Sequence, residues 1–116
     1  MTLIGDVKGK SCILIDDMAD TCGTLCTAAD LLQEQGAKEI YAFVTHGLFN
    51  GPAGDRIVKS SIKKLIATDS MPVSEEFKAK LGDRFQQVSL DLLLAEIIRR
   101  TYQNEDTTEL LNVPIY

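Results

Sequence analysis

Strand-like and helix-like stretches alternate along this chain, and that alternation restricts its fold more than any other feature of the sequence. Apolar, β-branched or aromatic runs typical of strands lie at residues 12–15, 39–47, 63–70 and 85–90. Helical stretches follow them, from near Thr24 to a stop at Gly36 and over residues 53–61, 74–81 and 90–102. We therefore expect an α/β fold, namely a three-layer, open, mostly parallel sheet with helices on both faces.

Local signals add detail to three of these elements. The run "CILI" at residues 12–15 is bounded by charged or polar residues and predicts a fully buried strand. Ser74 is expected to cap the helix that follows it, without a full capping box because Phe77 stands where a glutamate would be. Arg99 and Arg100 at the end of the last helix suit the negative end of its dipole. That helix carries one apolar stripe, formed by Leu90, Leu93, Leu94, Ile97 and Ile98.

Length, charge and cysteine usage exclude several classes of function. A chain of 116 residues is the size of one domain, and its net charge of −5 argues against a nucleic-acid partner. It has no apolar run of about eighteen residues and no signal-peptide core, so we expect a cytoplasmic protein without a membrane partner. The three cysteines are expected to be reduced structural thiols. Cys22 and Cys26 have helical spacing, but with His46 as the only histidine a zinc site is a poor interpretation.

The acidic segment at residues 16–24 carries the clearest chemistry. Ligands of open parallel sheets bind beyond the carboxyl ends of the strands, where this segment and "ATDS" at 67–70 both fall. A helix that begins near Thr24 presents unpaired backbone N–H groups and the positive end of its dipole, which favour a phosphate. Thr21 adds a hydroxyl donor, and Gly23 permits close approach of the backbone. The second half of the segment is therefore typical of a phosphate cradle.

The first half of the segment requires a different ligand group. Asp16 and Asp17 would repel phosphate, whereas carboxylates accept hydrogen bonds from sugar hydroxyls or hold magnesium through its waters. Both halves together match a ribose 5-phosphate group. The alternative is structural: one aspartate caps the helix and its neighbours are merely solvated.

These residues also carry a resemblance to a known family. The stretch "ILIDDMADTCGT" resembles the phosphoribosyl-pyrophosphate loop of type I phosphoribosyltransferases. More narrowly, "DDMADTCGTLCTAADLL", "THGLFNGPAGDRI" and "LLAEIIRRT" are together similar to ribose-phosphate pyrophosphokinases, also called phosphoribosyl-pyrophosphate synthetases. The similarity extends over nearly the whole chain.

The resemblance implies a substrate and a role for each residue of the loop. The family transfers the diphosphate of ATP to O1 of ribose 5-phosphate with magnesium, as part of nucleotide biosynthesis. Asp16 and Asp17 would then face the ribose hydroxyls. Asp20 would shape the loop by capping its amides, and Cys22 would contribute only its backbone. The residues expected around the 5-phosphate are Asp20, Thr21, Cys22, Gly23 and Thr24.

The resemblance also implies that residues 1–116 are one phosphoribosyltransferase-like domain, the C-terminal domain of a two-domain enzyme. ATP, the diphosphate and magnesium would be bound mainly by an N-terminal domain, so we assign this chain no catalytic residue and no metal ligand. We expect the isolated chain to be inactive and the longer enzyme to form homo-oligomers, as dimers or hexamers. Two alternatives stay open: a fragment of a nucleobase phosphoribosyltransferase, and an inactive regulatory subunit associated with the synthetase.

Overall fold

The computed structural model describes residues 1–112, which form a four-stranded sheet, four α-helices and two short 3₁₀ helices. The strands are hydrogen-bonded in chain order and all run parallel. The elements are β1 (Ser11–Ala19), α1 (Gly23–Glu34), β2 (Glu39–Gly47), α2 (Ala53–Lys59), β3 (Lys64–Thr68), α3 (Glu75–Leu81), η1 (Gly82–Arg84), β4 (Phe85–Val88), α4 (Asp91–Tyr102) and η2 (Thr108–Leu111). The expected α/β class and parallel sheet are confirmed.

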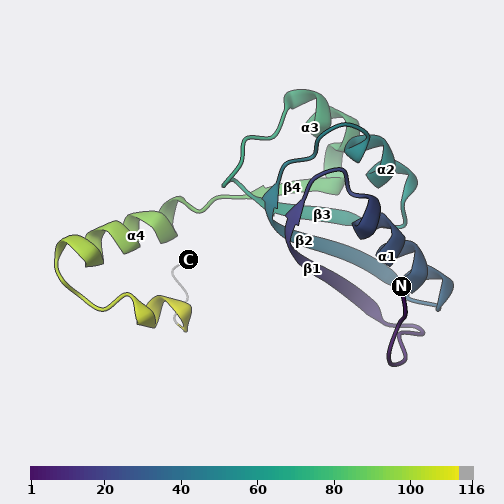
Figure 1. The fold of residues 1–116 in the computed structure, drawn as a ribbon, viewed down its shortest axis with the longest axis horizontal. Helices are drawn as coiled ribbons and strands as arrows, with labels where there is room; N and C mark the ends of the chain where they lie inside the picture. The colour runs from purple at the N-terminus through teal and green to yellow at the C-terminus, as the bar shows by residue number, and fades with distance from the viewer. Residues whose placement is uncertain (113–116) are drawn as a thin grey trace.

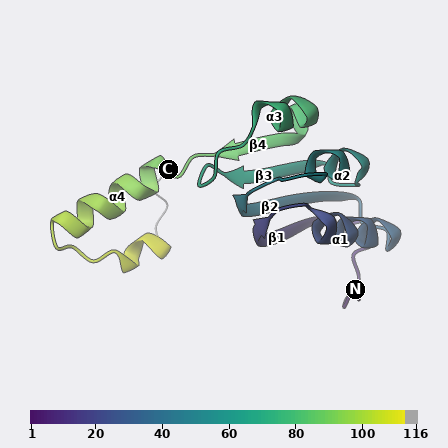
Figure 2. The same cartoon turned by 45° about the horizontal axis from the view of Figure 1, so that its top comes forward.

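The layers differ from the expectation of helices on both faces. Figures 1 and 2 show α1, α2 and α3 over one face of the sheet, while α4 extends away from it. Within residues 1–112 the second face has no helical cover. On that face Ile13 and Ile15 are 66% and 79% exposed. Within residues 1–112, the helices that pack on the sheet therefore all lie on one face.

The same arrangement explains why the fully buried strand predicted at residues 12–15 is half exposed. Within residues 1–112, β1 lies at the edge of the sheet and pairs with β2 alone. Cys12 and Leu14 pack against the core, whereas Ile13 and Ile15 point to the uncovered face. The apolar run alone could not show whether one or both faces of the strand are covered, because every residue in it is apolar and no alternation marks an exposed side.

The core lies between the sheet and α1–α3. Ala42, Val44 and Leu65 are fully buried on the covered face of the central strands. Beside them, the Phe49 and Phe77 rings stack at 4.3 Å between centroids, and Phe85 meets both edge-on. These contacts hold the loop after β2 against α3 and β4.

Helix caps form largely as predicted. The backbone N–H of Phe77 donates to Ser74 Oγ at 3.1 Å, so Ser74 is the N-cap of α3. Gly36, just past α1, has φ 91°, the left-handed conformation of a helix stop. None of the helices in residues 1–112 is long and apolar enough to span a membrane.

Candidate functional site at the carboxyl end of β1

The acidic segment lies where strand β1 meets helix α1. β1 continues to Ala19, four residues beyond the predicted end, so Asp16 and Asp17 belong to the strand. The connecting loop consists of only Asp20, Thr21 and Cys22. Because the loop is so short, the strand carboxylates and the helix N-terminus lie beside one another.

A cavity of about 290 Å³ opens at this junction. Six of the seven residues predicted to bind ribose 5-phosphate line it: Asp16, Asp20, Thr21, Cys22, Gly23 and Thr24. Asp17 is not among the lining residues, and its backbone N–H donates to Asp16 Oδ1 at 2.8 Å. The structure thus brings Asp16 into the cavity with the loop and leaves Asp17 outside it.

The N-terminus of α1 has the features of an anion site. Its N-cap residue, Cys22, has left-handed backbone angles (φ 64°, ψ 17°) and makes no side-chain cap. A left-handed residue next to helical ones turns successive backbone N–H groups toward one point, which forms an anion-binding concavity. The first turn of α1 contains no acidic side chain. The N–H groups of Gly23 and Thr24 are therefore presented to the cavity without a competing carboxylate on the helix.

The Cys22 thiol is excluded from this chemistry by burial. Cys22 is 5% exposed, and burial raises the pKa of its thiol to about 12, with a further upward contribution from Cys26. A thiol that keeps its proton is a poor nucleophile and a poor metal ligand. Only the backbone of Cys22 can serve the site. Residues 1–112 also contain no group of three His, Cys, Asp or Glu side chains that could hold a metal ion.

Asp20 is held by the loop after β2, in a way that the sequence did not predict. Its Oδ1 accepts a hydrogen bond from Asn50 Nδ2 at 2.9 Å, and its carbonyl accepts one from the Asn50 backbone N–H at 3.0 Å. The predicted role was to cap amides within its own loop. Instead, the carboxylate ties that loop to "FNGPAGDR". Asn50 was overlooked because a contact between two loops leaves no signature of spacing.

Arg56 of α2 holds the next residue of the loop. Its Nη1 donates to the Thr21 carbonyl at 3.1 Å. A Cβ atom at Gly23 would lie 3.1 Å from the same Nη1, so the glycine leaves room for the guanidinium. Beyond Gly23, Arg56 and Lys59 line a second cavity of about 370 Å³ that reaches Thr27 and Ser60. The loop after β2 and helix α2 therefore brace the candidate site, although only Gly23 is shared between the two cavities.

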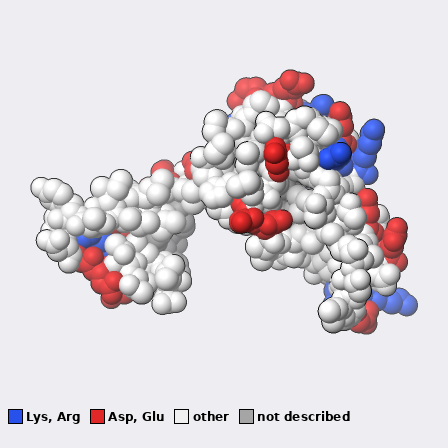
Figure 3. Space-filling model, in the orientation of Figure 1, with Lys and Arg blue, Asp and Glu red and all other residues white. Residues whose placement is uncertain are grey.

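The second segment at strand ends, residues 67–70, also braces its neighbours. Ser70 Oγ lies 2.7 Å from His46 Nδ1, and it donates to the Thr45 carbonyl at 3.2 Å. Thr68 Oγ1 donates to the same carbonyl. His46 at the end of β2 is thus tied to the loop after β3. Figure 3 shows acidic side chains near the carboxyl ends of the strands on the viewed face, which accords with a site that receives hydroxyl groups or cations on one side.

Comparisons with known proteins agree with the resemblance seen in the sequence. Residues 1–112 match the model of the family described as "Phosphoribosyl synthetase-associated domain". The chain is 46% identical over 110 residues to ribose-phosphate pyrophosphokinase 2 of Saccharomyces cerevisiae, a match that covers 95% of this chain and 33% of that protein.

A solved structure gives the same result in three dimensions. The phosphoribosylpyrophosphate synthetase from Mycobacterium smegmatis superposes with a TM-score of 0.81 at 40% identity, over 87% of this chain and 33% of that one. The chain therefore spans about one third of the length of the relatives it matches. The predicted resemblance is confirmed, and the chain belongs to the phosphoribosyl synthetase-associated domain family.

Proposed function

We propose that this chain is the ribose 5-phosphate-binding domain of a ribose-phosphate pyrophosphokinase, corresponding to the C-terminal domain of a longer two-domain enzyme. The observation that carries the proposal is the junction of β1 and α1. There a carboxylate, Asp16, and an uncapped helix N-terminus line one cavity of about 290 Å³. A phosphorylated sugar requires both kinds of group, since its hydroxyls donate hydrogen bonds to acceptors and its phosphate accepts them from N–H donors.

Each residue has a distinct role in this proposal. The backbone N–H groups of Gly23 and Thr24 bind the 5-phosphate, and the hydroxyls of Thr21 and Thr24 complete its shell. Asp16 accepts hydrogen bonds from the ribose hydroxyls. The backbone of Cys22 sets the curvature of the loop through its left-handed angles. Asp17 and Asp20 shape the site from outside the phosphate shell, because Asp20 is bonded to Asn50 and Asp17 to Asp16.

In the longer enzyme the product is phosphoribosyl pyrophosphate, made from ribose 5-phosphate and ATP. Phosphoryl transfer requires cationic groups and metal around the transferred group. We propose that the groups that bind ATP and its diphosphate lie in the N-terminal domain of the longer enzyme. We propose that magnesium would be held by the substrates and, through its waters, by Asp16, because carboxylates are among the oxygen ligands this ion prefers. We propose that the isolated chain binds the sugar phosphate weakly and is inactive, and that the full enzyme is a cytoplasmic homo-oligomer.

A titration with ribose 5-phosphate, followed by NMR with and without magnesium, tests this proposal. We expect amide shifts centred on residues 16–24, and smaller ones for ribose, which lacks the phosphate. Inorganic phosphate should shift the amides of Gly23 and Thr24 while leaving Asp16 largely unchanged. Absence of shifts at millimolar sugar phosphate would refute the binding role and favour an associated subunit that has lost its site. Binding of a nucleobase together with phosphoribosyl pyrophosphate would favour the phosphoribosyltransferase alternative.

A further inference from the structure

We infer that the second cavity, between helices α1 and α2, is a separate anion-binding site, which takes a small phosphate ester between Arg56 and Lys59. The cavity has a volume of about 370 Å³, against about 290 Å³ for the cavity at the β1–α1 junction. Gly23 is the one residue that lines both of them. The inference therefore does not depend on the proposed function, since a ligand can occupy either cavity without the other.

The walls of the second cavity are the facing sides of two neighbouring helices. Figures 1 and 2 show α1 and α2 side by side over the same face of the sheet. Gly23 and Asp30 line the cavity about two turns apart on α1, and Arg56 and Lys59 line it about one turn apart on α2. Ser61 Oγ donates to Asp30 Oδ1 at 3.2 Å, which joins the far ends of the two walls. The cavity is thus built entirely from residues 23–61.

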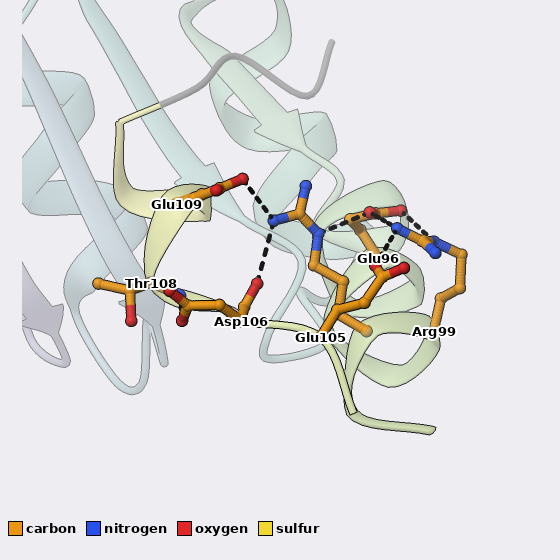
Figure 4. Close-up of polar contacts among 7 residues, drawn as sticks. Glu96, Arg99, Glu105, Asp106, Thr108 and Glu109 are labelled. Atoms are coloured by element: carbon orange, nitrogen blue, oxygen red, sulfur yellow. Dashed lines mark hydrogen bonds and ion pairs between the residues drawn. The ribbon is translucent and has the colours of Figure 1, made fainter. Parts of the chain in front are cut away.

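The two cations of this cavity have no acidic partner. Within residues 1–112, neither Arg56 nor Lys59 forms an ion pair, and Asp55 of the same helix pairs instead with Lys80 of α3 at 2.9 Å. The arginines of α4, in contrast, are each engaged by glutamates (Figure 4). The chain has 17 acidic and 12 basic side chains, so a shortage of carboxylates does not explain the two unpaired cations. They are available to an anion from outside the chain.

Arg56 is already held in position to receive a phosphate group. Its Nη1 donates to the Thr21 carbonyl at 3.1 Å, and a Cβ atom at Gly23 would crowd that nitrogen at 3.1 Å. A guanidinium carries five N–H donors in a rigid fork. Within residues 1–112 its remaining donors have no partner. The side chain is therefore anchored at one nitrogen and keeps further N–H groups for a charge-assisted contact with phosphate oxygens.

The other donor side chains of the cavity are engaged within the protein. Thr27 Oγ1 and Ser60 Oγ donate to backbone carbonyls four and three residues earlier in the chain, at 2.9 and 2.7 Å. Burial raises the pKa of the Cys26 thiol, which therefore keeps its proton at neutral pH. Among the described side chains that line the cavity, the unengaged donors belong to Arg56 and Lys59, and both are positively charged. This set of donors favours an anion over a neutral ligand.

Asp30 restricts which phosphate compounds fit. Its Oδ1 accepts from Ser61, and its other oxygen has no partner within residues 1–112. A ligand that extends from the two cations toward this carboxylate needs hydroxyl or amino groups there, because a carboxylate accepts hydrogen bonds and repels a second negative charge. The class of ligand that satisfies both ends is a phosphate ester of a small polyol or amino alcohol.

An NMR titration of the full chain with glycerol 3-phosphate tests the inference. We expect saturable shifts of the Thr27 and Ser60 amides, and we expect Lys59→Met to weaken this binding at least about fivefold. Lys38→Met is the matched control, because Lys38 is also exposed and without an ion pair in residues 1–112, but lies outside the cavity. Absence of shifts at Thr27 and Ser60 at millimolar ligand would overturn the inference, as would an equal loss in Lys38→Met. Failure of the proposed function is separate, since Thr24 lines the other cavity alone.

The fold of both variants is checked by circular dichroism. Lys59 and Lys38 are exposed, so neither substitution should unfold the chain.

A comparison with 3-phosphoglycerate tests the class of ligand. This compound has the same length as glycerol 3-phosphate but carries a carboxylate at the end away from the phosphate. We expect it to bind the second cavity more weakly than glycerol 3-phosphate does, and we expect Asp30→Asn to narrow that difference. Tighter or equal binding of 3-phosphoglycerate to the unmodified chain would overturn the assigned class. So would a difference between the two ligands that Asp30→Asn leaves unchanged.

Discussion

Arg56 offers the most direct test of how the phosphate loop is held. In Arg56→Met the side chain keeps its length but loses the hydrogen bond from Nη1 to the Thr21 carbonyl, which spans 3.1 Å. Because Arg56 is exposed, we expect this hydrogen bond to stabilise the loop by only about 1 kcal/mol. The loop would then have to be ordered by the ligand itself. We expect affinity for ribose 5-phosphate to fall about fivefold.

The loss of a positive charge near an anion would also weaken binding, and Lys59→Met measures that effect separately. Lys59 lies in the last turn of the same helix and lines the same second cavity as Arg56. Its replacement removes an equal charge without touching the loop. Titration calorimetry or NMR on both variants, at two ionic strengths, gives the comparison. Equal losses for the two variants, or unchanged affinity in Arg56→Met, would refute the bracing role of Arg56.

Further substitutions and a pH titration test other parts of the structure. Thr24→Val should weaken ribose 5-phosphate binding by about 1–3 kcal/mol if its hydroxyl donates to the phosphate, and unchanged calorimetric affinity would remove Thr24 from the shell. Arg84 donates to the carbonyls of Ile57 and Val58 at 2.9 Å and of Ile62 at 2.6 Å, so Arg84→Met should lower the free energy of unfolding by about 3 kcal/mol in urea denaturation. Arg84→Lys should recover only part of it, since an ammonium cannot reach this fork of carbonyls, and full recovery would contradict the geometry. The pKa of Cys22 is raised from 9.0 to about 12 in the folded chain. The unfolded chain therefore loses this proton first, and stability should decline as the pH rises from 9 toward 12, a decline that Cys22→Ala should reduce.

The elements that carry strong local signals were predicted correctly. β2 has the predicted bounds, Glu39–Gly47, because charged residues and glycine delimit its β-branched run. Ser74 caps α3 through a bond within four residues of chain, which sequence spacing can reveal. The position of the acidic loop before α1 was predicted for the same reason. All of these features depend on residues close together in the sequence.

Features that depend on distant residues were missed or wrong. Asn50 lies 30 residues from Asp20, and Arg56 lies 35 residues from Thr21. No sequence spacing indicates hydrogen bonds between residues so far apart. The burial of β1 was overestimated because the apolar residues of a strand show that it can be buried, but not which other elements cover it. Asp17 was grouped with Asp16, although neighbouring residues of a strand point in opposite directions.

The sequence by itself determined the parallel α/β order and the chemical character of the loop. It did so because hydrophobic period and helix-terminal residues act within a few positions of the chain. Only the tertiary structure decided which carboxylate enters the cavity, what braces the loop, and where α4 goes. These depend on packing and on clamps such as Asp69 with Leu90, which join residues 21 positions apart. Such contacts form only when the strands lie side by side, and only the tertiary structure therefore shows their geometry.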